Sequence, residues 1–215
     1  LVEDAAAVEL LEKLTQSLVT AVPDNKYRFR FHVARESQIN AFALPGGYIV
    51  VHSELLLRAG SAEELLGVLA HEISHVTEQH GTRNLLASAG LALTLQLLIG
   101  DAGGVFGTLA SAAPFLLTQK YSRGFEREAD RRGYQLLVRA NIDPSGMVSF
   151  FEKLKTEEAR RREKLRKQGD SGELISELSE FMSTHPTTDS RIADLREMVA
   201  AHNGAYRDLS ETFAA

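Results

Sequence analysis

Five consecutive residues, His71 to His75, carry the pattern H-E-x-x-H. Two histidines four positions apart share one face of an α-helix, so their imidazole rings can bind one Zn²⁺ ion. Glu72 lies one residue further round the helix and can take a proton from a water held at the metal. The pattern therefore indicates metal-assisted hydrolysis, although it also occurs by chance and is not proof when it stands alone.

The residues around this pattern predict a buried helix. Ser61 to Glu64 reads as a capping box, apolar residues recur at helical spacing from Leu65 to Val76, and Gly81 supplies a stop. The alternative to a metal site is a pair of core histidines, His71 and His75, stacked on an apolar helix face.

Zinc bound by two histidines needs a third protein ligand and one open position for water. The longer pattern H-E-x-x-H-x-x-G-x-x-H fails here, because Glu78 and Gly81 occupy its glycine and last histidine positions. His80 comes one residue too early, and on a continuing helix it would point away from His75. We expect His80 to be solvated at the helix end, with a favourable contact to the helix dipole.

A better third ligand lies within residues 121–130. Glu126 and Asp130 are four residues apart and so share one helical face. Glu126 can bind zinc, and Asp130 can accept the outer ring N–H of a ligand histidine and so fix its tautomer. The alternative is an ordinary charged helix surface paired with neighbouring arginines, which is the interpretation we give to Glu128.

Four segments occur in a fixed order along the chain: Asn40–Val51, Leu69–His75, Tyr121–Asp130 and the loop His185–Arg191. Together they resemble the CAAX-prenyl-protease/HtpX-like zinc endopeptidases, peptidase family M48 of the gluzincin group, over about residues 27–200. The resemblance implies one Zn²⁺ per chain, bound by His71, His75 and Glu126. It also implies that Glu72 is the catalytic base and that Asp130 contacts a ligand histidine without binding the metal itself.

The loop from His185 to Arg191 matches the His-Pro segment of that family, which implies a place near the active site. His185 could donate a hydrogen bond to the tetrahedral oxyanion, or lie over the zinc and block it. Arg191 could contribute through its charge, so both are candidate catalytic residues. The alternative is a loop anchor in which Arg191 pairs with a carboxylate. Thr188 or Asp189 is expected to cap the following helix.

Composition limits the class of protein. A chain of 215 residues that is 44% hydrophobic can bury one core, and we expect a single metallopeptidase domain over residues 1–215. The net charge of −5 argues against nucleic acid as a partner. The absence of Cys excludes disulfides and thiolate metal sites and fits a periplasmic or cell-envelope protein, soluble or peripherally attached. No signal sequence is visible, and anchoring upstream of Leu1 stays open.

The resemblance and the residue patterns together predict an α+β, mainly α-helical, zincin-like (gluzincin) fold. A small, mostly antiparallel three-stranded sheet should lie beside the H-E-x-x-H helix. The expected parts are an N-terminal helix within residues 1–22, a catalytic core over 27–140, and C-terminal helices over 144–215, two of them at about 173–183 and 189–202. The expected strands are 27–33, 39–44 and 48–51, the last two joined by the turn Pro45–Gly47.

Two segments carry hypotheses about partners. The strand edge formed by Asn40, Ala41, Phe42 and Ala43, continuing to Leu44, could bind an extended polypeptide through main-chain hydrogen bonds. The alternative is a hairpin that only supports the zinc helix. Residues 85–117 are nearly uncharged and are expected to form a soluble helical hairpin, broken at Gly100–Gly104, that packs near the active site. That hairpin could be a lid, a buried helix pair, or a peripheral contact with a membrane or envelope complex.

The expected function is that of a zinc endopeptidase acting on unfolded or misassembled proteins. One rival is an envelope assembly factor or chaperone whose zinc site is shut by the His185 loop or the 85–117 hairpin. A second rival is a structural metal site with four protein ligands. The sequence leaves the natural substrate and the oligomeric state open.

Overall fold

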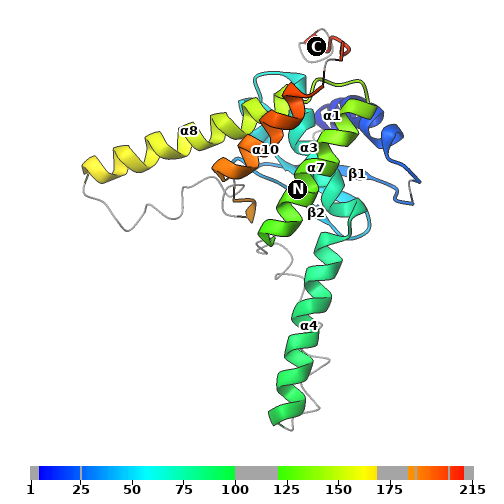
Figure 1. The fold of residues 1–215 in the computed structure, drawn as a ribbon, viewed down its shortest axis with the longest axis vertical. Coiled ribbons are helices and arrows are strands. Elements are labelled where there is room, and N and C mark those ends of the chain that lie inside the picture. The colour runs from blue at the N-terminus through cyan, green and yellow to red at the C-terminus, as the bar shows by residue number, and fades with distance from the viewer. Residues whose placement is uncertain are drawn as a thin grey trace.

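The structure is a computed structural model that describes residues 5–24, 26–99, 121–168, 184–186, 188–202 and 204–210. Its elements are α1 (Ala5–Ala21), β1 (Arg30–Ala34), β2 (Ala41–Leu44), β3 (Tyr48–His52), α2 (Ser53–Arg58), α3 (Ala62–Thr77), α4 (His80–Ile99), α7 (Arg123–Arg139), α8 (Ser145–Gln168) and α10 (Asp189–Ala200). One small sheet lies beside a group of helices, and α1, α2 and α3 contact its strands (Figure 1). The expected mainly helical α+β class is confirmed.

The sheet is mixed, which corrects the expectation of a mostly antiparallel one. Its strand order is β1-β3-β2, with β1 parallel and β2 antiparallel to β3. Strand β3 takes the centre because the consecutive residues Ile49 to Val51 are all buried, which suits a strand covered on both faces. The turn at Gly46 and Gly47, both with positive φ, folds β2 back along one side of β3 and leaves β2 at an edge.

Helix α3 is the central helix of the fold. Thirteen of its sixteen residues are buried, and it lies against α7, α8 and β2. The predicted N-cap is confirmed, since the Ser61 hydroxyl accepts from the Glu64 amide at 3.2 Å. Helix α8 approaches α3 so closely that a Cβ placed on Gly67 would lie 2.6 Å from the Met147 Cα.

The end of α3 differs from the expected one. The helix stops at Thr77, Gln79 adopts a left-handed conformation with φ 56°, and α4 begins at His80. Helix α4 then runs away from the helical body (Figure 1). Only this first half of the expected 85–117 hairpin is described; the Gly100–Gly104 break and the second half lie outside the described residues. Within the described residues, no helix is long and apolar enough to cross a membrane.

Helices α1, α8 and α10 are held by an apolar face or by side-chain caps. Helix α1 buries Leu11, Leu14 and Leu18 as its apolar face. Asp143 accepts from the Ser145 amide at 2.8 Å at the start of α8, and the Thr188 hydroxyl accepts from the Arg191 amide at the start of α10. The helix expected at about 173–183 lies outside the described residues.

Candidate metal centre

Four buried side chains converge between α3, α7 and the loop before α10. His71, His75, Glu126 and His185 each offer one ligand atom, and these atoms all lie within 4.8 Å of one another. The Nε2 atoms of His71 and His75 are 3.0 Å apart, and they lie 3.5 Å and 3.4 Å from the two carboxylate oxygens of Glu126. Ligands about 2.0–2.1 Å from a tetrahedral Zn²⁺ would be about 3.3 Å from each other. The donor set and its spacing therefore fit a zinc ion.

Two helices bring these groups together. His71 and His75 lie on one face of α3, and Glu126, Asp130 and Gly133 lie on one face of α7. A Cβ added to Gly133 would lie 3.1 Å from the His71 amide nitrogen. The missing side chain at Gly133 thus lets the backbone of α7 approach α3 at the level of the first histidine.

Asp130 and Arg191 support this cluster from one side. His71 Nδ1 lies 3.0 Å from Asp130 Oδ1. Arg191 donates from Nε and Nη2 to the two Asp130 oxygens at 2.6 and 2.7 Å, and its Nη1 lies 2.6 Å from Glu126 Oε2. Arg191 is 3% exposed. This geometry agrees with the loop-anchor alternative, in which Arg191 positions two carboxylates.

His185 occupies the fourth corner of the cluster. Its Nδ1 lies 3.0 Å from Glu126 Oε1 and 3.4 Å from His71 Nε2, and its Nε2 lies 3.5 Å from Glu72 Oε1. The side chain is fully buried. Together with His71, His75 and Glu126 it would give a metal four protein ligands. A catalytic zinc site keeps one of its four positions for water, so this position of His185 is compatible with the blocking role.

Glu72 is fully buried beside the cluster. Burial raises the pKa of its carboxyl group, although His185, His71 and the Ala43 amide act to lower it. A carboxyl whose pKa is raised toward neutrality is suited to accept and return a proton.

The pKa values of the two histidines of α3 are shifted in opposite directions. Burial acts to lower the pKa of His71, but Asp130 and Glu126 outweigh this effect and raise it to about 9. Burial lowers the pKa of His75 well below its ordinary value, even though Glu126 opposes the change. Burial acts to raise the pKa of Glu126, but His185 and the two ring partners hold it well below the ordinary value.

The expectation that His80 is solvated is wrong. His80 is fully buried, with its Nδ1 2.9 Å from His75 Nδ1 and its Nε2 3.3 Å from Glu128 Oε2. The expectation assumed a continuing helix, whereas the left-handed Gln79 reverses the chain and returns the His80 ring to His75. Burial lowers the pKa of His80, although Glu128 opposes it. Glu128 remains partly exposed and also lies 3.5 Å from Arg83 Nη1.

Among the described residues, strand β2 is an edge strand of the sheet, and it lies next to the cluster. The Asn40 carbonyl accepts from the His52 amide at 2.9 Å, so by the alternation of antiparallel pairs the amides of Ala41 and Ala43 point away from β3. A crevice of about 20 Å³ runs beside Ala43, Leu44 and His75. Tyr121 forms part of its wall and stacks on His75, with ring centroids 4.0 Å apart.

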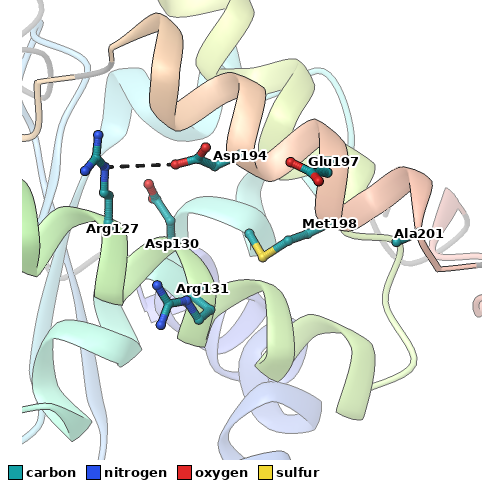
Figure 2. A pocket seen from close by; sticks show the side chains of 7 residues that line it. All are labelled: Arg127, Asp130, Arg131, Asp194, Glu197, Met198 and Ala201. Carbon is teal, nitrogen blue, oxygen red and sulfur yellow. Dashed lines mark ion pairs between the residues drawn. The ribbon is translucent and has the colours of Figure 1, made fainter.

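A separate hollow lies between α7 and α10 (Figure 2). It encloses about 390 Å³ and is lined by Arg127, Asp130, Arg131, Asp194, Glu197, Met198 and Ala201. An ion pair at 3.9 Å joins Arg127 and Asp194 across it. Asp130, which contacts His71, is part of this lining. None of the four side chains of the cluster lines the hollow.

The fold and the buried His/Glu cluster on two packed helices are those of a metalloprotease of the H-E-x-x-H type. Residues 5–199 match the model of Peptidase family M48. The chain belongs to peptidase family M48, as its four sequence segments indicated.

Known relatives agree with this membership. The chain is 34% identical over 208 residues to the β-barrel assembly-enhancing protease of Yersinia pestis, covering 91% of this chain and 40% of that protein. It is 28% identical to the mitochondrial metalloendopeptidase OMA1 of Saccharomyces cerevisiae, covering 83% and 49%. It is 27% identical to the metalloprotease LoiP of Escherichia coli, covering 89% and 70%. The chain thus spans about two fifths of the length of the assembly-enhancing protease.

Proposed function

We propose that this chain is a zinc-dependent endopeptidase that hydrolyses peptide bonds of unfolded or misassembled proteins, with residues 1–215 as one metallopeptidase domain. His71, His75 and Glu126 hold the Zn²⁺, one ion per chain, and Asp130 orients His71. The observation that carries the proposal is the mutual spacing of 3.0–3.5 Å among the three ligand side chains, with Glu72 beside them.

The chemistry divides between the ion and the chain. Zinc, when bound, supplies a Lewis acid that polarises the scissile carbonyl and makes water more acidic. Glu72 takes the proton from the attacking water and returns it to the leaving amine. Its burial and raised pKa suit both transfers. Arg191 keeps the carboxylates of Glu126 and Asp130 aimed at the ligand cluster.

The substrate binds along the free edge of β2, from Asn40 to Ala43. Main-chain pairing at this edge accepts many sequences, because the hydrogen bonds involve only backbone groups. The outward amide of Ala43 lies close enough to Glu72 to affect its pKa. An extended polypeptide on this edge would therefore pass the catalytic base.

His185 controls access in this proposal. Its ring lies within the cluster, 3.0 Å from Glu126 through Nδ1, which supports a site that His185 can close. Activity requires the loop carrying His185 to move away from Glu126. The same observation favours a second candidate function, an assembly factor or chaperone in which the site stays shut.

We place the protein in the periplasm or cell envelope, where contact with a membrane or an envelope complex is peripheral. The chain contains no Cys, and bacterial relatives are named for β-barrel assembly. Its partner is a polypeptide substrate rather than nucleic acid, in keeping with the net charge of −5.

A metal analysis paired with a casein digest tests the proposal. The purified chain should contain about one zinc per molecule and cleave casein, and a chelator should stop cleavage until zinc is restored. Bound zinc without chelator-sensitive cleavage of casein would support the assembly factor or a structural metal site. Cleavage that persists without metal would refute the zinc mechanism.

A further inference from the structure

The outer nitrogen of His75 needs a partner if the ring binds a metal. Its Nε2 lies within the ligand cluster, 3.0 Å from His71 Nε2. A ring that binds metal through Nε2 carries its proton on Nδ1. Because His75 is buried, that N–H requires an acceptor inside the protein.

The group at that position is His80. Its Nδ1 lies 2.9 Å from His75 Nδ1, and its Nε2 lies 3.3 Å from Glu128 Oε2. When His75 Nδ1–H donates to His80 Nδ1, the proton of a neutral His80 is on Nε2 and faces the carboxylate. The three side chains then form one hydrogen-bonded chain in which each N–H has an acceptor.

Packing fixes the His80 ring in this orientation. His80 is fully buried and stacks on Phe125, with centroids 4.4 Å apart and planes 13° apart. The Arg83 guanidinium lies 4.5 Å from the centre of the Phe125 ring and 3.5 Å from Glu128 Oε2. The hydrogen-bonded series His75–His80–Glu128 is thus held in place by residues near the beginning of α4 and of α7.

The two histidines of α3 are supported in related ways. His71 has the Asp130 carboxylate directly at its Nδ1, and Arg191 holds that carboxylate. His75 reaches a carboxylate through a second imidazole. Carboxylates behind metal-bound histidines fix the tautomer and aim of the ring.

We propose that His80 and Glu128 are positioning residues for the metal, which hold His75 as the Nδ1–H tautomer with Nε2 directed at the ion. This inference rests on the proposed zinc site and adds two residues to it. Loss of such outer partners typically lowers metal affinity about 10- to 100-fold.

Zinc affinity of the full chain, measured by competition with a fluorescent chelator, tests the proposal. His80→Phe keeps a ring against Phe125 but removes the acceptor, and we expect zinc to bind about 10- to 100-fold more weakly. His80→Asn places an amide oxygen near the former Nδ1 and should recover most of the affinity. His202→Phe, at an exposed histidine, is the matched control and should bind zinc like the wild type.

Thermal unfolding of the metal-free proteins separates positioning from folding. The proposal requires that metal-free His80→Phe melts close to the wild type while its zinc affinity falls. Equal affinity in His80→Phe and the wild type overturns it, as does an equal loss in His80→Phe and His80→Asn. A wild type that binds no zinc overturns the proposed function as well, which distinguishes the two failures.

Glu128 provides a second test should His80→Phe fail to fold. Glu128→Ala alters a partly exposed side chain and removes the carboxylate at the end of the chain. Its zinc affinity should fall, by up to about tenfold, and Glu128→Gln should lie between it and the wild type. Wild-type affinity in Glu128→Ala would overturn the role of Glu128 in the chain.

Discussion

Gly133 on α7 lies directly against the backbone of His71 on α3: a Cβ at Gly133 would come within 3.1 Å of the His71 amide nitrogen and 3.2 Å of the Ala70 carbonyl carbon. The same face of α7 carries Glu126 and Asp130. Gly133 thus determines how closely Glu126 and His71, two of the proposed metal ligands, can approach each other, although it is not a proposed ligand itself.

Gly133→Ala should weaken metal binding. The added methyl meets main-chain atoms, which cannot rotate away, so α7 must move outward and carry Glu126 with it. We expect a loss of about tenfold or more in zinc affinity and about 1–3 kcal/mol in the free energy of unfolding. Gly90→Ala on α4, where an added Cβ meets nothing within 4 Å, is the control and should be neutral or slightly stabilising. Chelator competition and denaturant unfolding measure both effects.

Glu72→Gln should abolish proteolysis while zinc stays bound. The amide keeps the size of the side chain but cannot accept a proton from water, and loss of a general base typically costs about 10²–10⁴-fold in rate. Casein cleavage and metal content are measured on the same preparation. Full activity in this variant would show that another group is the base.

His185→Ala separates the two roles considered for this residue. If the ring mainly blocks the fourth corner, its removal should raise casein cleavage, by about tenfold when nine-tenths of the molecules are shut. If the ring instead stabilises the oxyanion, cleavage should fall. The structure favours the increase, because His185 Nδ1 lies 3.0 Å from Glu126 Oε1. The exposed His202→Ala serves as the control.

Ala43→Pro tests the substrate edge. Ala43 and Ile49 form a non-hydrogen-bonded pair, so the substitution removes an outward amide without breaking the bonds between β2 and β3. We expect KM for an extended peptide to rise about fivefold or more, from the loss of one backbone hydrogen bond, with zinc affinity unchanged. Because the same amide acts to lower the pKa of Glu72, the pH profile of kcat should shift as well. Ala43→Ser keeps the amide and should bind peptide like the wild type. An unaltered KM in Ala43→Pro would place the substrate elsewhere.

Glu64 should make stability depend on pH. Burial acts to raise the pKa of Glu64, but hydrogen bonds from Lys153, Gly60 and Ser149 outweigh it and lower the pKa. A lowered folded-state pKa stabilises the protein above the unfolded pKa of about 4.3, and the gain disappears as pH falls through the folded value. The difference in unfolding free energy between wild type and Glu64→Gln should therefore be up to about 1 kcal/mol at pH 6 and shrink toward pH 3. A difference that grows on acidification would contradict the lowered pKa.

Local signals in the sequence predicted much of this molecule. The Ser61 cap of α3 and the Thr188 cap of α10 depend on neighbouring residues, and each is present. The convergence of His71, His75 and Glu126 followed from spacing on two helices together with a family resemblance.

Features that depend on chain reversal or on helix contact were not predictable in the same way. Strand β1 pairs with β3, which is not the next strand along the chain, and this pairing is parallel. The order of the strands in the sequence did not indicate either feature. The position of His80 depends on one left-handed residue, Gln79, which is not a glycine. A glycine three residues after Asp130 within a helix was a usable signal for close helix packing, since glycine in a helix costs about 1 kcal/mol relative to alanine.

The contact between His80 and His75 also connects the candidate metal centre to helix α4. His80 is the first residue of α4, a 20-residue helix that stands away from the body (Figure 1). Such a helix is about 30 Å long. A sideways force on its far end would therefore be transmitted to its first residues. The contact there is the 2.9 Å approach of two imidazole nitrogens. A partner that bound α4 would therefore act on the position of His80, and through it on His75, one of the proposed metal ligands.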